Sequence, residues 1–332
     1  MTRITIAGRT VDVVHETVGI ESLKLNPDNP RIRFLLKHTG GKKDQKSLMK
    51  LIKDQPGYDD IQKAVRKSGG LQEAIIIASD GLVVEGNNRT TAVATLHDGA
   101  PNDKRWQTVP VTRLPRDIDG KSMAVLMAGY HIAGKTRWRA YAQAEHIHSM
   151  SHDHKLSLTQ IAEETRMSER EVQQYLDAFN YLVNEVLPHA KNGNATEILE
   201  SKFSHALEFF KTKKNEAHRE DKSARKVLAK LIATNKIKGA EVREFDKVYS
   251  NRKSAAELRK SDFKAAKKTL TKVDPLSGSR ALKLVKSATE ALKEMSQSEI
   301  ALFKKSGPAR RTILELREAV QSVAEVIGAV KG

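Results

Sequence analysis

Residues 75–92 read IIIASDGLVVEGNNRTTA, and this stretch decides the fold of the N-terminal part. Two apolar runs flank an Asp-Gly pair, which is typical of a β-hairpin. The second run leads into a glycine and then into a pattern that predicts a helix from Arg89 onward. A strand that enters a helix in this way leaves backbone N–H groups facing any anion that binds there. The stretch therefore predicts a phosphate site made by Gly86, Asn87, Asn88 and Arg89.

The remaining N-terminal segments predict further strands and helices around this hairpin. Residues 4–13 alternate like a small hairpin, and residues 107–112 read as another strand. A helical pattern covers residues 46–67 with a break at 55–57, and the two prolines of residues 25–30 predict an ordered turn. From about Ser122 onward the periodicity is helical. We therefore expect an α+β domain at 1–120 and an all-α remainder, divided into 121–200, a basic region at 201–272, and 279–332.

Composition and charge narrow the classes of function. The 332 residues include no cysteine, which excludes disulfides, thiolate nucleophiles and sulfur-ligated zinc sites. No stretch approaches the roughly 18 consecutive apolar residues of a membrane span, so we expect a cytoplasmic protein without a membrane partner. The net charge is +17, and residues 201–332 hold 31 Lys and Arg against 16 Asp and Glu. Such an excess suits a polyanion such as DNA, although a solvated helical surface explains it too.

A second signal lies in residues 157–182. Ser157 with Gln160 and Ser168 with Glu171 form two capping boxes eleven residues apart, as two helices of a helix-turn-helix require. The turn between them places Arg166 where glycine is usual. The second helix is expected to read DNA bases, or alternatively to pack as a plain helical hairpin. Its candidate DNA-binding residues are Ser168, Glu169, Arg170, Gln173 and Gln174.

The order of these motifs resembles the ParB family and the wider ParB/sulfiredoxin fold. The resemblance rests on NPDNPRIR at residues 26–33, GLQEAI at 70–75, GNNRTTA at 86–92 and the following helix-turn-helix. It implies an α+β ParB/sulfiredoxin-like domain, a helix-turn-helix domain and a helical C-terminal part. As a function, it implies a dimeric protein that binds double-stranded DNA in the partition of a plasmid, phage or mobile element, with a partner NTPase.

The resemblance also implies a pocket for a nucleoside triphosphate, CTP or ATP, with magnesium. Gly86, Arg89 and Ala92 match the family's phosphate motif, whereas Asn87, Asn88 and Thr91 stand where the family has a glutamate and two further arginines. The next family motif, a Glu-Asn pair followed by an arginine, falls near His131 and Ile132, where the metal-linked asparagine is absent and Lys135 stands in the basic place. Gly134 and Lys135 are the candidates for a phosphate contact from this segment.

An enzyme remains the alternative to a binding protein. Sulfiredoxin activity is excluded because it needs a cysteine, and the chain has none. Other relatives of the fold act as nucleases or kinases, and a nuclease or nucleotide-hydrolysing enzyme of this kind would use Glu85 as its catalytic carboxylate. The structural alternative is that Glu85 pairs with Arg89.

Three other patterns require explanation. Residues 129–136 match the P-loop pattern, but no strand is expected before them, and we expect instead a helix through 123–128, a break at Gly134 and a new helix from Arg137 that contains Trp138. His146, His148, His152 and His154 are grouped as in a zinc site, yet a polar helix end explains them better and we expect no metal. Apolar residues at spacings of three and four in residues 285–295 and 313–330 predict a helical hairpin or a dimerisation element.

Overall fold

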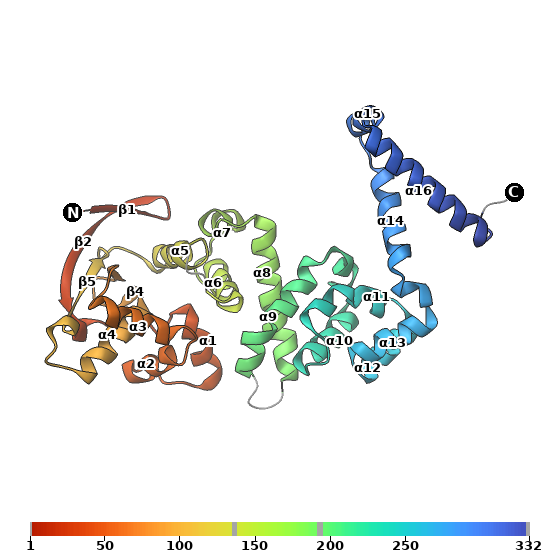
Figure 1. The fold of residues 1–332 in the computed structure, drawn as a ribbon. Coiled ribbons are helices and arrows are strands. Elements are labelled where there is room, and N and C mark those ends of the chain that lie inside the picture. Colours follow the sequence, from red (N-terminus) through yellow and green to blue (C-terminus); the bar gives the residue numbers. More distant parts are fainter. Residues whose placement is uncertain (1, 135–137, 191–194, 330–332) are drawn as a thin grey trace. The chain divides into compact units, whose positions relative to one another are not determined.

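The computed structural model describes residues 2–134, 138–190 and 195–329 of the chain (Figure 1). It contains two compact units, Met1–Lys267 and Lys268–Gly332. The first unit begins with strands and helices and continues as helices alone, which confirms the predicted α+β region followed by an all-α region. The boundaries predicted at residues 120 and 200 lie inside this first unit.

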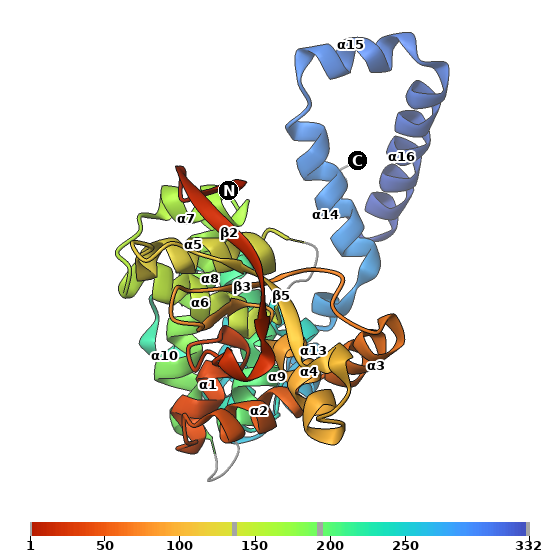
Figure 2. The same ribbon diagram turned by 90° about the vertical axis from the view of Figure 1, so that its left-hand side faces the viewer.

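A five-stranded sheet with the order β1-β2-β5-β3-β4 begins the first unit (Figure 2). Its strands are β1 (Thr2–Ile6), β2 (Arg9–Gly19), β3 (Ile75–Ile77), β4 (Val83–Glu85) and β5 (Thr108–Arg113). Strands β3 and β5 run parallel, and the other neighbours are antiparallel. Ala7 and Gly8 both have positive φ, 50° and 74°, as a tight two-residue hairpin turn requires. Both predicted hairpins are confirmed.

Four helices pack around this sheet. They are α1 (Pro30–Thr39), α2 (Gln45–Lys53), α3 (Tyr58–Ser68) and α4 (Asn87–Gly99), with short 3-10 turns at η1 (Ile20–Ser22) and η2 (Lys104–Trp106). Aliphatic side chains from β3, β4 and β5 and from these helices form one buried core, which includes Ile32, Ile52 and Ile75. This core fixes the end of β4 against the start of α4.

The ordered turn predicted before Pro30 is present, with the N–H of Asn29 donating to the carbonyl of Asn26 at 3.2 Å, but helix α1, which follows it, was not expected. The helix starts at Pro30 itself, because the first helical position needs no N–H donor. The side chain of Asn29 caps it by accepting a hydrogen bond of 3.1 Å from the backbone N–H of Arg31. Arg31 and Arg33 thereby become helical residues two positions apart, and their side chains leave α1 in different directions.

Two helices connect the sheet to the helical region. Helix α5 (Gly120–His131) confirms the helix expected around residues 123–128, and α6 (Ala140–His152) follows the Gly134 break. Trp138 was expected inside the second helix, but it precedes α6, and its backbone N–H donates to the carbonyl of His131 at 3.0 Å. Arg33 of α1 forms a two-bond ion pair, at 2.7 and 2.8 Å, with the buried Glu145 of α6.

The predicted helix-turn-helix is present as α7 (Leu158–Thr165) and α8 (Glu169–Tyr181). Both capping boxes form, at Ser157 with Gln160 and at Ser168 with Glu171. Arg166 occupies the left-handed region at φ 55° and ψ 35°, as the sequence predicted for this turn. A π-helical turn, η3 (Leu182–Val186), and a 3-10 turn, η4 (Leu187–His189), follow α8.

Short helices complete the first unit around a core that contains Phe203, Phe209 and Phe245. They are α9 (Ala195–Lys211), η5 (Lys213–His218), α10 (Lys222–Ala233), η6 (Gly239–Glu244), α11 (Phe245–Tyr249) and α12 (Arg252–Lys260). Helix α13 (Phe263–Val273) begins in the first unit and ends in the second. The break expected near residues 238 and 239 lies between α10 and η6.

The second unit contains η7 (Pro275–Gly278), α14 (Arg280–Lys293), α15 (Gln297–Lys305) and α16 (Gly307–Val326). Figure 2 shows α15 joining one end of α14 to one end of α16. Several large apolar side chains of the predicted seams are exposed: Val285, Leu292, Val320, Val323 and Ile327. The description ends before Val330, the last residue of the predicted seam.

Candidate functional site

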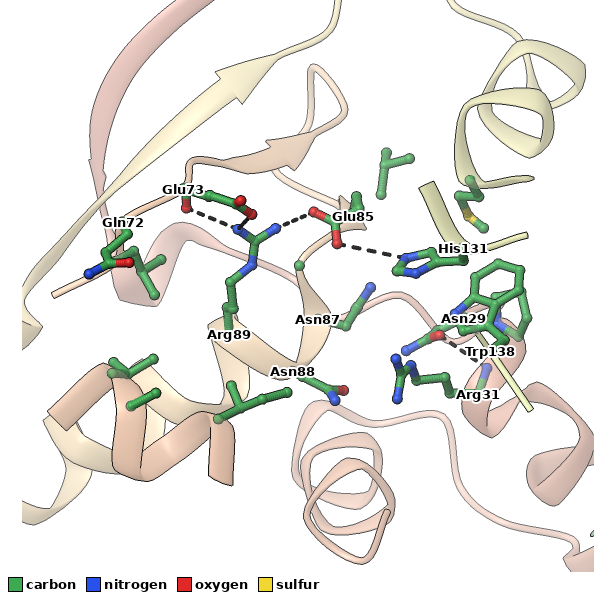
Figure 3. Close-up of a pocket in the computed structure, with 18 of the residues that line it drawn as sticks. Asn29, Arg31, Gln72, Glu73, Glu85, Asn87, Asn88, Arg89, His131 and Trp138 are labelled. Carbon is green, nitrogen blue, oxygen red and sulfur yellow. Dashed lines mark hydrogen bonds and ion pairs between the residues drawn. The ribbon is translucent and has the colours of Figure 1, made fainter. Parts of the chain in front are cut away.

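A cavity of about 410 Å³ lies where the first turn of α4 meets the start of α1 (Figure 3). Its walls come from α1, α3, the segment before β3, the end of β4, the first turn of α4, the end of α5 and Trp138. The residues predicted to hold a phosphate at 86–89 all border it. The sequence thus located the cavity correctly, while the ligand stays a prediction.

Gly86 makes the sharp connection between β4 and α4. Its φ is +100°, a conformation that L side chains rarely adopt, and an added Cβ would lie 3.3 Å from both Arg89 Nη2 and Ile75 Cγ1. A residue other than glycine would therefore be strained and would press on Arg89. The first N–H groups of a helix have no partner within it, and those of α4 belong to residues that line the cavity.

Arg89 is less free than the sequence suggested. Its Nη2 contacts the carboxylate of Glu85, and its Nη1 donates to the Glu73 carboxylate and to the Glu73 carbonyl, each at 3.1 Å. Figure 3 shows the guanidinium between the two glutamates. The structural alternative for Glu85, an ion pair with Arg89, is therefore what the structure shows.

Glu85 is a buried carboxyl group inside this arrangement, with 9% of the residue exposed. Burial raises the pKa of Glu85, while the positive charge of Arg89 and its hydrogen bond act in the opposite direction. The Nε2 of His131, from the end of α5, lies 3.7 Å from Glu85 Oε1. A carboxyl group in this setting can change its protonation when charge enters the cavity.

Arg31 is the cavity residue that the sequence reasoning missed. Within the described part of the chain its guanidinium has no hydrogen-bond or ion-pair partner, and burial lowers the pKa of Arg31. It borders both the main cavity and a smaller one of about 190 Å³, which Arg139 and Glu200 also line. The signal was present in the sequence, because a proline at the first helical position sends Arg31 and Arg33 to different sides of α1.

The other residues that were predicted to bind phosphate differ in their contacts and in whether they line the cavity. The side chain of Asn87 accepts from the N–H of Asn26 at 3.0 Å and donates to the carbonyl of Val83 at 3.3 Å, so it holds the local backbone together. Asn88 lines the cavity. Gly134 is not among the lining residues, and an added Cβ there would meet the carbonyl oxygen of Tyr130 at 2.2 Å. Lys135 lies outside the described residues.

The structure also shows where the residues of the P-loop pattern and of the histidine group lie. The P-loop pattern starts in the last turn of helix α5. A P-loop instead follows a β-strand, so the pattern does not form one here. The polar helix end was a correct expectation for His152 but wrong for His146, which is buried and contacts the carbonyl of Ala124 at 2.8 Å. Across the described ranges, no group of three or more potential metal-binding side chains is present.

The predicted DNA-reading residues all lie in or next to the first two turns of α8. Ser168 caps the helix, Glu169 accepts a 2.6 Å hydrogen bond from Thr159, and the amide of Gln173 donates to Asp177 at 2.8 Å. Gln174 is half-buried. Arg170 is exposed, and among the residues described here its guanidinium has no recorded partner.

The helix-turn-helix itself is acidic. Residues 157–181 contain five Asp and Glu and two Lys and Arg. Basic side chains come instead from the end of α9, which packs along α8 and places the ammonium group of Lys211 5.8 Å from the ring centre of Tyr175. Lys213 and Lys214 follow in η5. Contacts to a phosphate backbone would therefore depend on α9 and η5 more than on α8.

Comparisons with known proteins point to one group of structures. No protein-family model matches the chain, and no curated protein is significantly similar to it. A Pnob8-like ParB-N domain is 13% identical with a TM-score of 0.45, covering 75% of this chain and 98% of that one. ParB from Caulobacter crescentus, complexed to the centromeric parS site, is 14% identical with a TM-score of 0.36, covering 70% and 98%.

The same Caulobacter crescentus protein complexed with CTP-gamma-S is 14% identical with a TM-score of 0.23, and the alignment covers 63% of this chain and 98% of that one. TM-scores below 0.5 at such identities are too low to transfer a function, so the argument for function has to come from the site. No helix among the described residues is long and apolar enough to cross a membrane.

Proposed function

We propose that this chain is a ParB-like protein that binds double-stranded DNA and holds a nucleoside triphosphate, through its phosphates, in the cavity beside α4. Its role would be plasmid, phage or mobile-element partition or a related DNA transaction. The order of motifs along the sequence supports the proposal, as does the combination, in one compact unit, of a capped helix-turn-helix with a cavity that arginines and the first turn of a helix border.

One observation carries the nucleotide part of this proposal. The partly buried guanidinium of Arg31 has no partner within the described ranges, and it lines the same cavity as the first turn of α4. Burial is unfavourable for a cation with no direct ion-pair partner, and Glu85 offsets this cost only through space, so an anion that contacts Arg31 would be favourable. Helix N–H groups and an arginine together are the donors that bind phosphate groups in proteins.

A thermal-shift series tests the nucleotide part. The four ribonucleoside triphosphates are added with magnesium, with and without DNA, to the full chain. A ligand at 100 times its dissociation constant stabilises the folded state by about 2.7 kcal/mol, a readily measured shift. The absence of any shift with all four nucleotides, in both conditions, would contradict a nucleotide site.

The DNA part is tested by the salt dependence of binding. Fluorescence anisotropy with a labelled duplex should show affinity that falls steeply with salt, because each neutralised phosphate releases counter-ions. Replacing Lys211, Lys213 and Lys214 by Gln should reduce the slope of log K against log salt by about one per lost contact. An unchanged slope would remove the α9 and η5 lysines from the interface.

Dimerisation would use the second unit. Val320 and Val323 of α16 are exposed at 45% and 59%, and they belong to a seam with spacings of three and four. Val323→Lys should lower the association constant measured by sedimentation equilibrium without unfolding the first unit. A protein that stays monomeric before any substitution would contradict the dimer.

A partner NTPase is also part of the proposal.

The enzyme alternative rests on Glu85, whose pKa burial raises toward the range of a general base. A nuclease or nucleotide-hydrolysing enzyme would lose turnover in Glu85→Gln. A binding protein would show no turnover to lose, and its DNA affinity would be unchanged. Measuring phosphate release and DNA cleavage with both proteins separates the two functions.

A further inference from the structure

The Arg89 side chain already has an internal anion in the place where a phosphate is expected. Its Nη2 contacts Glu85, and its Nη1 is 3.1 Å from the Glu73 carboxylate. The two carboxylates differ in setting, because the Glu73 side chain is 86% exposed and the Glu85 side chain is 11% exposed. Glu73 can swing into solvent, whereas Glu85 remains at the cavity wall beside any bound anion.

The charged and titratable groups that face Glu85 come from every side of the cavity. They are Arg89 from α4, Glu73 from the segment before β3, Tyr130 and His131 from α5, and Arg31 from α1. Two guanidinium groups face two carboxylates, so the cavity is nearly neutral without counting His131. A dianion that contacts Arg89 would then lie next to the negative charge of Glu85, and the repulsion is strong where water is excluded.

We propose that Glu85 couples anion binding in this cavity to proton uptake: a tetrahedral oxyanion displaces its carboxylate from Arg89, and Glu85 takes up a proton as the anion binds. This inference rests on the proposed function, because it assumes that the cavity binds phosphate groups. The shared chemistry is a tetrahedral dianion, whether free or as part of a nucleotide. The proton comes from solvent, and no covalent bond is made or broken.

The protonation state sets the direction of the pH effect. Burial raises the pKa of Glu85 before any anion binds, while the contact with Arg89 acts in the opposite direction. A neighbouring anion raises the pKa of a carboxyl group again, because it disfavours the charged form. Binding linked to one proton strengthens about tenfold for each pH unit that the solution falls, between the pKa of the free and the bound protein.

Calorimetric titration of the full chain with sulfate tests the proposal. Sulfate keeps its charge between pH 5.5 and pH 8, so any change of affinity belongs to the protein. Repeating the titration in two buffers with different ionisation enthalpies measures proton uptake. We expect proton uptake on binding, and affinity that rises by up to about tenfold for each unit of lower pH in the linked range. A second arm with CTP and magnesium shows whether a nucleotide competes with sulfate.

Two variants separate Glu85 from its neighbours. Glu85→Gln keeps the shape but has no negative charge, and it should bind sulfate about tenfold more tightly at pH 7.5 without proton uptake. Glu185→Gln is the matched control, because Glu185 forms a similar carboxylate contact with Arg225 away from the cavity. That control changes the net charge equally and should bind like the unmodified protein.

The outcomes distinguish this inference from the proposed function. Sulfate binding without proton uptake, or Glu85→Gln that binds no more tightly, overturns the inference and leaves the cavity as an anion site. Proton uptake that persists in Glu85→Gln assigns the proton to another group of the cavity, such as Glu73 or His131, and also overturns it. No binding of sulfate or nucleotide by any of the three proteins overturns the proposed nucleotide site itself. The uptake measured on the unmodified protein needs no variant to fold.

Discussion

The cavity beside α4 and the helix-turn-helix were both expected to contact phosphate-bearing ligands, and they present their charges in opposite ways. The cavity holds guanidinium groups out of water, with Arg31 unpaired in the described structure and Arg89 bonded to two glutamates. The helix-turn-helix exposes Arg170 to solvent on a surface that is acidic overall. Electrostatic interactions are strong where water is excluded and weak where it is not. Replacing a single charged residue should therefore change ligand affinity more in the cavity than in the helix-turn-helix.

The largest effect is expected at Arg31. Arg31→Ala removes a charge-assisted contact worth about 2 to 3 kcal/mol, so the affinity for sulfate or nucleotide should fall about 30- to 160-fold. The protein without ligand should be as stable as before or more stable, because the lost guanidinium is partly desolvated and makes no hydrogen bond or ion pair among the described residues. Chemical denaturation and calorimetric titration measure the two quantities.

The control for Arg31 is Arg9→Ala, which removes an equal charge from the exposed pair of Arg9 with Asp117. It should leave anion binding unchanged. If both variants bind the anion like the unmodified protein, then the cavity does not depend on Arg31 and the comparison with the helix-turn-helix loses its basis.

A buried histidine behind the cavity, His146, also predicts that the stability of the folded protein depends on pH. The exposed residues of the helix-turn-helix predict no such effect. His146 packs against Trp138, with ring centres 5.0 Å apart, and burial lowers the pKa of His146 to about 3. The unfolded chain therefore binds a proton below about pH 6.5 while the folded protein does not, and stability falls as the pH falls. The loss should approach about 1.4 kcal/mol per pH unit, or roughly 2 kcal/mol at pH 5.

Denaturant titrations at pH 5 and pH 7 measure this loss. In His146→Leu the difference between the two pH values should be smaller by about the same 2 kcal/mol. His152→Leu is the control, because His152 is exposed at the end of the same helix. An equal pH response in all three proteins would show that other groups dominate the acid sensitivity.

At the helix-turn-helix the expected effects are smaller and concern DNA. Arg170→Ala should weaken specific binding by about 1 to 2 kcal/mol and relax the preference at one base pair, if Arg170 reaches a base edge. Asn180→Ala changes an exposed residue at the other end of α8 and should have no effect. Anisotropy against a set of single-base substitutions measures both. A uniform loss over all sequences would reassign Arg170 to a phosphate contact.

The sequence predicted most of the local structure in both regions. The Asp-Gly hairpin, the glycine before α4 and the two capping boxes depend on residues within a few positions of each other, so short patterns determine them. The start of α1 was missed because Pro30 was taken as a helix breaker, although proline suits the first helical position.

The electrostatic partners could not be predicted in the same way. Arg89 meets Glu73 sixteen positions away, and Arg33 meets Glu145 at a separation of 112. Such pairs depend on how β4, α4, α1 and α6 come together, and no periodicity in the sequence encodes that. The predicted phosphate residues therefore marked the correct cavity but not its unpaired cation, Arg31.

The smallest effect tests the turn that sets the geometry of the helix-turn-helix. Arg166 ends α7 at φ 55°, and the next N–H, of Met167, donates to the carbonyl of Ala162 at 3.1 Å. A side chain in this left-handed conformation is unfavourable, and glycine adopts it freely. Arg166→Gly should therefore stabilise the protein by about 0.5 to 1 kcal/mol relative to Arg166→Ala, which removes the same charge and keeps a Cβ. Equal stability of the two variants in urea would mean that the turn relaxes to another conformation, and the orientation of α8 would then not be fixed by this residue.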